Sequence, residues 1–256
     1  MARPPSLLET LHGIIERTYR MRTGIRDVGL FVLGDDGYRR LYGSAAVCEK
    51  VALPVGAGGD ARLLLRLDSR SGALRAAIYY PDAMVRRLEE RSPARGLDDG
   101  NIDDFAVLVE ELDHLLCVAS RVGEGRAFSL LELELHANVT KYLAGALFLA
   151  LSRSGAEGGA GRRPPSAGRG PASGLTEGER AWLRYHLFEK LEFADEDPEV
   201  RARYRHAARL GWRFLAGLEA LHPSGRLAAL RAFHRRSHEE KLAMLGGGVP
   251  EPRELA

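Results

Sequence analysis

The residues of this chain whose types and spacing best suit chemistry are Glu110, Glu111 and His114. Glu110 and His114 are four residues apart, so on a helix both side chains project from one face, one turn apart. Two metal-binding side chains at this spacing can hold one ion from a rigid element, as the two histidines of an HExxH helix do. Glu111 would project beside that ion, where a general base could take the proton of a metal-activated water. The spacing therefore indicates a metal site on a helix, with Glu111 as its base.

Further candidate ligands follow on the next helical stretch, at Glu132, Glu134 and His136. If the two stretches form a helical hairpin, one of these three would lie opposite Glu110 and His114 and supply the third protein ligand of a catalytic metal. Glu132 and Glu134 lie about 200° apart around a helix, so they cannot both face the same ion. From spacing alone, the third ligand stays open among the three.

These two stretches resemble the ImmA/IrrE-type zincin-like metallopeptidases. In that family the metal helix reads roughly His-Glu-Leu-x-His-Leu-Leu, and the next helix roughly Glu-x-Glu-Ala-Asn-x-Phe-Ala-x-x-Leu-Leu. The corresponding segments here are Glu110-Glu111-Leu112-Asp113-His114-Leu115-Leu116 and Glu134-Leu135-His136-Ala137-Asn138-Val139-Thr140-Lys141-Tyr142-Leu143. The family's order of a helix, a small antiparallel sheet, the metal helix and a second helix also fits, over roughly residues 5 to 150.

Two positions depart from the family pattern, since its first His is Glu110 here and the Glu before Ala-Asn is His136 here. If both are ligands, the departures compensate, and the resemblance implies a Zn²⁺ site formed by Glu110, His114 and His136. It also implies a zinc peptidase that hydrolyses a protein or peptide substrate, with Glu111 as the catalytic base. A metal-free zincin-like scaffold that binds a protein partner is the alternative, because such a relative would also have lost the family motif.

The elements that would position these residues begin with a helix at Ser6–Arg22, where apolar residues recur at spacings of three and four. Four strands are expected next, and the short Gly/Asp-rich breaks between them favour a mainly antiparallel sheet. Their ranges are Asp27–Leu33, Tyr38–Tyr42, Ala61–Leu67 and Leu74–Tyr80.

Beyond Pro81 the apolar spacing is helical. The expected helices are Asp82–Glu90, Asn101–Val122, Phe128–Ser152, Thr176–Phe193, Pro198–Leu221 and Ser224–Leu245. Residues 154–174 are rich in Gly and Pro and offer almost nothing to bury, which predicts a flexible linker. We therefore expect an α+β zincin-like domain at residues 1–153 and an annex of three helices at 175–256, which would bind a protein partner or mediate self-association.

Composition narrows the class of protein. Lys and Arg number 37 against 35 Asp and Glu, so a net charge of +2 gives no reason to expect a nucleic-acid partner. The two cysteines, Cys48 and Cys117, cannot form a disulfide framework. The longest apolar run, Leu143–Leu151, is too short to cross a membrane, and the N-terminus lacks a secretory pattern. These features predict a cytoplasmic protein that does not contact a membrane.

A second enzyme class is suggested by two Glu-x-x-His pairs, Glu111 with His114 and Glu219 with His222. Such pairs are typical of ferritin-like di-iron bundles. Two features weigh against this alternative, since His222 directly precedes a proline and the strand-rich N-terminal part has no place in that fold.

Other conspicuous residues are expected to be structural. Cys117 falls on the apolar side of its helix and predicts a buried thiol. His234 and His238 are four residues apart but lack a partner motif, so a solvated face is expected. The arginines of the segment 201–213 predict a solvated face whose stems cover apolar neighbours, with a phosphate-facing surface as the alternative.

Overall fold

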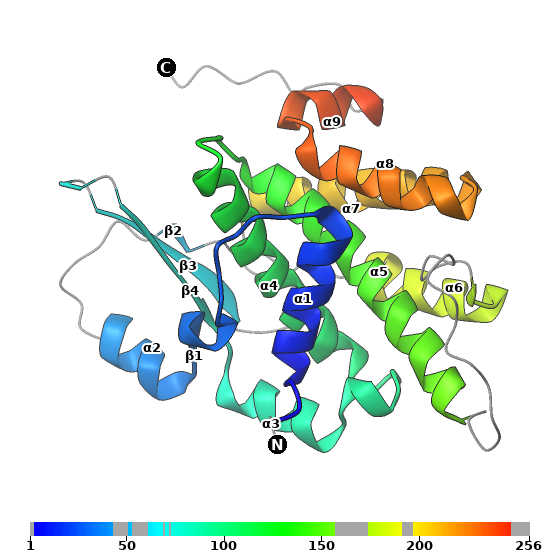
Figure 1. Ribbon diagram of the computed structural model, residues 1–256, viewed down its shortest axis with the longest axis horizontal. Helices are drawn as coiled ribbons and strands as arrows, with labels where there is room; N and C mark the ends of the chain where they lie inside the picture. The colour runs from blue at the N-terminus through cyan, green and yellow to red at the C-terminus, as the bar shows by residue number, and fades with distance from the viewer. Residues whose placement is uncertain are drawn as a thin grey trace.

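The computed structural model describes residues 3–42, 51–52, 61–68, 70–71, 73–156, 174–190 and 197–246. Helices dominate the molecule, and a small sheet lies at one side of it (Figure 1). The α-helices are α1 (Leu7–Tyr19), α2 (Asp35–Tyr42), α3 (Asp82–Glu90), α4 (Ile102–Gly123), α5 (Leu130–Ala156), α6 (Glu177–Arg184), α7 (Pro198–Ala220), α8 (Pro223–Arg235) and α9 (His238–Met244). The strands are β1 (Val32–Leu33), β2 (Val51–Ala52), β3 (Arg62–Leu67) and β4 (Leu74–Tyr79), and the short helical turns are η1 (Val28–Phe31), η2 (Pro93–Arg95) and the π-helical η4 (Tyr185–Glu189). This combination confirms the α+β class.

The sheet is mixed, with strand order β1-β4-β3-β2. Strand β3 pairs antiparallel with β4, as expected, and also with β2, which was not predicted. The edge strand β1 runs parallel to β4. Helix α4 packs against β3 and β4, and the Tyr80 hydroxyl donates a hydrogen bond to the Leu108 carbonyl at 2.7 Å. The sheet therefore covers one side of the helix that carries the candidate metal ligands.

Two predicted strands are wrong in part or in whole. Of Asp27–Leu33 only Val32–Leu33 is a strand, because Val28–Phe31 forms the 3-10 turn η1. Residues 38–42 form the second half of α2. Acidic residues occupy the first turn of this helix and basic residues its last turn, which complements the helix dipole at both ends. The Tyr79 hydroxyl donates to Asp35 Oδ1 at 2.8 Å, and the ring of Tyr38 stacks on that of Tyr79 with centroids 4.4 Å apart. Tyr38, which suggested a strand, thus helps to hold α2 against β4.

Helices α4 and α5 form the expected hairpin, and α5 lies between α4 and α7. The chain turns after α4 at Gly125, whose φ of 65° is a conformation that favours glycine. Every residue from Glu132 to Ala146 is buried, because partner helices cover α5 on more than one side. Within the described part of the chain, no helix combines the length and the apolar character needed to cross a lipid bilayer.

The C-terminal helices pack on the N-terminal elements (Figure 1). Helices α6 and α7 contact α5, α8 contacts α1, and their apolar side chains belong to one core cluster with those of α4 and α5. A Cβ atom on Gly211 of α7 would lie 3.1 Å from the Cβ of Asn138 on α5, so the two helices approach closely. The division into 1–153 and 175–256 stays a prediction, and residues 157–173 of the expected linker lie outside the described residues.

The stretch Ser224–Leu245 is not one helix, because the chain breaks between α8 and α9. Arg236 is extended, and Ser237 begins α9 with a capping box that it forms with Glu240. The break leaves the carbonyls of His234 and Arg236 available to Arg121 of α4, whose Nη2 donates to them at 2.7 and 3.0 Å. This contact fastens the end of α8 to the hairpin.

Candidate metal centre

The middle of α4 carries ionisable side chains into the interior of the protein. Glu110, Glu111 and His114 are only 5%, 1% and 2% exposed, respectively. The sheet packs on one side of α4 and α5 on another, so these groups are removed from water. Burying charges is costly unless they are paired or bind a metal. Each of these groups is therefore expected to have an ionic or hydrogen-bonding partner or to bind a metal.

Glu110, His114 and Glu134 form one cluster, which we call the Glu–His–Glu cluster. Each offers a ligand atom, and these atoms all lie within 4.8 Å of one another. The Nε2 atom of His114 is 3.9 Å from Oε2 of Glu134, which is also buried. The structure thus places Glu110 and His114 side by side, as their spacing on α4 predicts, and adds Glu134 from α5.

Both ring nitrogens of His114 are buried without a hydrogen-bond partner among the described residues. Nδ1 lies 3.6 Å from Oε2 of Glu111, beyond hydrogen-bonding distance, and that carboxylate oxygen also lacks a partner. Unsatisfied buried polar atoms are uncommon and call for an explanation, of which a bound ion is one. A cation bound between His114, Glu110 and Glu134 would give one ring nitrogen of His114 a partner and would neutralise the charge of the two carboxylates.

The charges around this cluster are unbalanced. Burial raises the pKa of Glu134 to about 8, and burial likewise raises the pKa of Glu111. Burial disfavours the imidazolium form of His114, but Glu111, Glu134 and Glu110 together raise its pKa to about 9. Burial also opposes ionisation of Glu110, yet Lys141, which donates a hydrogen bond to it, and His114 hold its pKa below the ordinary value. Three carboxyl groups thus share two cationic partners, and a divalent ion would stabilise their ionised forms.

His136, the third ligand that the resemblance implies, lies elsewhere. Its Nδ1 is 2.8 Å from Oδ2 of Asp113, and its Nε2 is 3.2 Å from Nδ1 of His234. Glu134 and His136 are two residues apart on α5 and therefore project about 200° apart, so only one of them can face Glu110. The structure places Glu134 on that face, so it does not bring His136 together with Glu110 and His114.

Glu132 shares a face of α5 with His136 and does not join the Glu–His–Glu cluster either. Its Oε1 accepts hydrogen bonds from Arg121 at 2.5 Å and from Lys241 of α9 at 2.6 Å. All three side chains are buried. Glu132 is therefore the counterion of two buried cations and joins α9 to the hairpin.

Tyr204 is not among the predicted site residues. It is buried on α7, and burial, followed by the charges of Glu134 and Glu110, raises the pKa of its phenol well above the ordinary value. It lies among the arginines of the segment 201–213, which were predicted to form a solvated face. Helix α7, which carries this buried phenol, packs on α5, the helix of Glu134.

A second buried cluster consists of Cys117, His136 and His234, whose candidate ligand atoms also lie within 4.8 Å of one another. The prediction of a buried thiol at Cys117 is confirmed. The expectation of a solvated His234 is wrong, since this side chain is only 4% exposed and packs against His136. Its neighbours come from α4 and α5, which no local pattern in α8 could indicate.

The second pair of the di-iron alternative does not join the cluster. The carboxylate of Glu219 accepts a hydrogen bond from the Tyr142 hydroxyl at 2.6 Å. His222 is exposed at the start of α8 and bonds to Ser224. Among the described residues, neither of them belongs to a group that could hold a metal.

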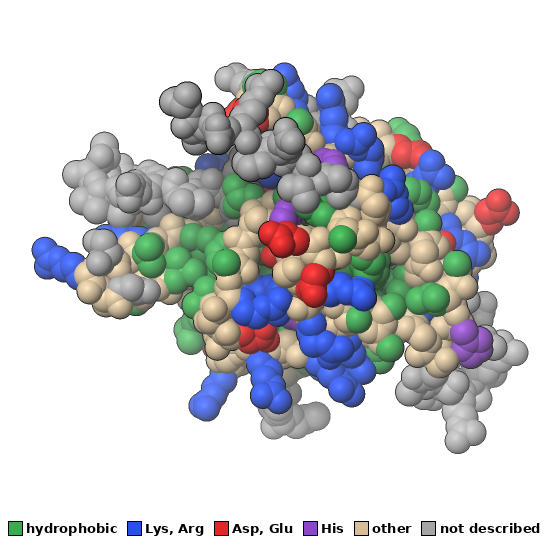
Figure 2. Space-filling view, turned by 90° about the horizontal axis from the view of Figure 1, so that it is seen from above, with side chains coloured by type: hydrophobic (Ala, Val, Ile, Leu, Met, Phe, Trp, Pro, Cys, Tyr) green, Lys and Arg blue, Asp and Glu red, His purple; other side chains and the backbone are tan. Residues whose placement is uncertain are grey.

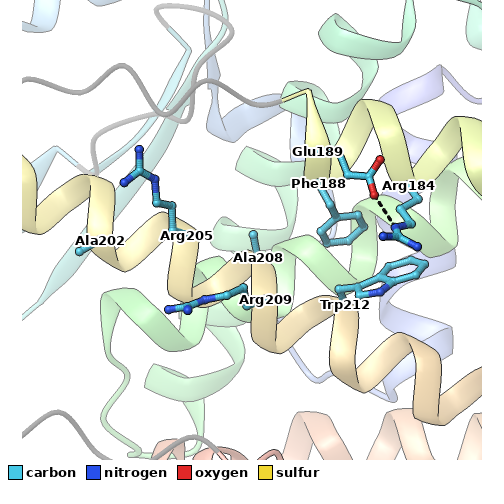
Figure 3. A pocket seen from close by; sticks show the side chains of 8 residues that line it. All are labelled: Arg184, Phe188, Glu189, Ala202, Arg205, Ala208, Arg209 and Trp212. Atoms are coloured by element: carbon cyan, nitrogen blue, oxygen red, sulfur yellow. Dashed lines mark ion pairs between the residues drawn. The ribbon is translucent and has the colours of Figure 1, made fainter.

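The arginines of α7 border a surface groove of about 500 Å³ (Figure 3). Arg205 and Arg209 are exposed, as predicted for a solvated face. Arg184 lies 4.9 Å above the Trp212 ring and pairs with Glu189 at 2.6 Å. Lys and Arg side chains also gather on the face shown in Figure 2, with acidic side chains among them. The groove stands apart from both buried clusters in the residues that line it.

Comparison of the chain with known protein families, characterised proteins and solved structures finds no match.

Proposed function

We propose that this protein is a metal-dependent hydrolase of zincin-like type, similar to the ImmA/IrrE metallopeptidases, which cleaves a peptide bond. The observation that carries the proposal is the convergence of Glu110, His114 and Glu134 in the protein interior, with Glu111 beside them. The unsatisfied nitrogens of His114 and the surplus of buried carboxyl groups support a cation at this point. Glu134 takes the place of His136 as the third ligand.

In this proposal, each residue has a distinct role. A bound Zn²⁺ would supply Lewis acidity, which activates water and polarises the scissile carbonyl. Glu110, His114 and Glu134 would hold the ion from two rigid helices. Glu111 would accept a proton from water and pass it to the leaving amine, a transfer favoured by the burial that raises its pKa.

Zinc is the proposed metal, and one imidazole with two carboxylates is within its usual ligand range. The same donors suit Mn²⁺ and Fe²⁺, because carboxylate-rich sites favour harder ions than thiolate sites do. The proposed substrate is a protein or peptide, and the C-terminal helices would bind a protein partner or a second copy of the chain. Because all four residues are nearly fully buried, access of a substrate requires an element packed on α4 or α5 to move.

Metal analysis of the purified protein tests the proposal directly. His114→Ala should lose one ion per chain relative to the wild type, whereas His222→Ala, which removes an exposed histidine, should keep it. Glu111→Gln should retain the ion and lose peptidase activity by a factor of about 10²–10⁴, the usual contribution of a general base. Equal metal content in the wild type and His114→Ala would contradict the proposal.

The choice of Glu134 over His136 can be tested through coupling. If Glu110 and Glu134 share an ion, the effects of Glu110→Gln and Glu134→Gln on metal affinity should be non-additive by about 0.5–3 kcal/mol. The effects of Glu110→Gln and His136→Gln should add within about 0.5 kcal/mol, because these residues have no shared partner. The reverse pattern would restore His136 as the third ligand.

A metal-free scaffold is the second candidate function, and one contact favours it. The ammonium group of Lys141 donates to Oε2 of Glu110 in the interior, so part of the carboxylate charge is balanced without an ion. In that case the protein would bind a partner through its C-terminal helices. The absence of any transition metal from the purified protein, together with no uptake on titration of Zn²⁺, would favour the scaffold.

A further inference from the structure

A second set of metal-binding side chains meets where α8 contacts the α4–α5 hairpin. Cys117 belongs to α4, His136 to α5 and His234 to α8, and their candidate ligand atoms all lie within 4.8 Å of one another. The three side chains are 4%, 1% and 4% exposed, respectively. They share no residue with the Glu–His–Glu cluster, so any ion bound here is separate from the one proposed above.

The orientation of His136 suits metal binding. Its Nδ1 lies 2.8 Å from Oδ2 of Asp113 and can donate its proton to that carboxylate. A ligating histidine commonly donates its other ring N–H to a carboxylate, which leaves the opposite nitrogen free to bind the metal. Asp113 is itself held by Thr140, whose Oγ1 donates to Oδ1 at 2.8 Å. The ring is therefore fixed with Nε2 directed toward His234.

The spacing of the two imidazoles matches that of ligands on one ion. Nε2 of His136 and Nδ1 of His234 are 3.2 Å apart. Two nitrogens bound to a tetrahedral ion at about 2.0–2.1 Å lie about 3.3 Å apart. We propose that Cys117, His136 and His234 form a second metal site, which binds Zn²⁺ through one thiolate sulfur and two imidazole nitrogens.

The donor set and its surroundings indicate what the ion does. One thiolate and two imidazoles favour zinc or copper over magnesium, calcium or manganese. The Tyr19 ring packs on His136 with centroids 4.3 Å apart, and the Phe233 ring stacks on it at 5.8 Å, so the site is walled by aromatic side chains. An ion enclosed in this way would join α8 to the hairpin.

A hydrogen-bond chain without metal is the competing account of the same geometry. The Cys117 thiol can donate to Asp113 at 3.8 Å, and one of the two facing imidazole nitrogens can donate to the other. The two accounts differ in whether sulfur binds a metal. That difference can be measured by spectroscopy.

Cobalt substitution of the full-length protein tests the site, with Co²⁺ alone as the probe. Co²⁺ added to the metal-free protein should produce the near-ultraviolet absorption of thiolate-to-cobalt charge transfer. Cys117→Ser should abolish this absorption, whereas Cys48→Ser should retain it and thereby exclude the other cysteine of the chain. His114→Ala should also retain it, because the Glu–His–Glu cluster contains no sulfur. Failure of the first metal site is therefore distinguishable from failure of this one.

Asp113 provides a graded test. Asp113→Asn should weaken Co²⁺ and Zn²⁺ binding at this site about 10–100-fold, the usual effect of losing a partner that orients a ligating histidine. Circular dichroism of each variant checks that the fold persists, and His234→Gln is the second ligand variant should Cys117→Ser unfold. Lack of a charge-transfer band in the folded wild type, or its persistence in folded Cys117→Ser, would overturn the proposal and leave the hydrogen-bond chain.

Discussion

Replacement of Glu132 by Gln should destabilise the protein strongly, because this carboxylate neutralises two buried cations. Oε1 of Glu132 accepts from Arg121 at 2.5 Å and from Lys241 at 2.6 Å, and the three side chains are 4%, 3% and 1% exposed, respectively. Removing one partner of a buried ion pair costs about 3–5 kcal/mol, because a charge is left buried without compensation. Glutamine keeps the shape of the side chain, so packing contributes little to the change.

The expected loss lies near the lower end of that range, about 3 kcal/mol. In Glu132→Gln, Arg121 keeps its hydrogen bonds to the carbonyls of His234 and Arg236. Lys241 keeps the cation–π contact of its Nζ with the Phe233 ring, 5.0 Å from the centroid. Urea unfolding of the wild type and Glu132→Gln measures the difference. Glu124→Gln is the matched control, since the partly exposed pair of Glu124 with Arg126 should contribute less than about 1 kcal/mol.

The stability difference between wild type and Glu132→Gln should also depend on pH, in a direction set by the pKa of Glu132. Burial favours the protonated form of Glu132, but Lys241 and Arg121 hold the pKa of this carboxyl group below its ordinary value of 4.5. A depressed pKa in the folded state contributes stability above the unfolded value that is lost as the pH falls through the folded one. The difference in the free energy of unfolding between wild type and Glu132→Gln should therefore decrease below pH 4.5. A loss under about 1 kcal/mol at neutral pH would refute the reasoning, because that is the range of exposed pairs.

Three further perturbations test the organisation of the protein. Tyr204→Ala should speed removal of the bound metal by a chelator, because it removes a buried side chain from α7, which packs on the helix of Glu134, whereas Tyr185→Ala, at an exposed tyrosine, should not. Trypsin should cut first within residues 154–174, and the two fragments should stay together on gel filtration because α7 packs on α5. Lys141→Met should raise metal affinity roughly tenfold in a Zn²⁺ titration, since a competing cation leaves Glu110; unchanged affinity would separate Lys141 from the site.

Helical periodicity was sufficient to predict the hairpin but not its facing residues. Helices α4 and α5 appear where apolar spacing predicts them, and Glu110 with His114 share a face for the same reason. The face of α5 that meets α4 could not be deduced, because every residue from Glu132 to Ala146 is buried. A helix buried all round has no polar face to indicate its orientation. The third ligand therefore depended on tertiary packing.

Local composition led to two wrong predictions, at segment 38–42 and at His234, where contacts with residues distant in sequence determine the structure. The aromatic residues of the segment 38–42 favour a strand, but the charges at the ends of α2 and the contact of Tyr38 with Tyr79 stabilise a helix. His234 has charged neighbours in sequence, yet α8 places it against His136. In both contacts the partner residue lies far outside the window of roughly ten residues over which periodicity is judged, so local sequence could not predict either of them.

The two proposed metal sites follow from one feature of helix geometry. Asp113 and His114 are adjacent on α4, so their side chains diverge by about 100° and reach different parts of the interface with α5. Glu134 and His136 diverge by about 200° on α5, and each meets the α4 residue on its own side: Glu134 lies near His114, and His136 bonds to Asp113. A ligand exchanged between Glu134 and His136 would require α5 to rotate by about half a turn. Such a rotation would break the buried bonds of Glu132 to Arg121 and Lys241, so the packing of α5 itself keeps the two donor sets apart.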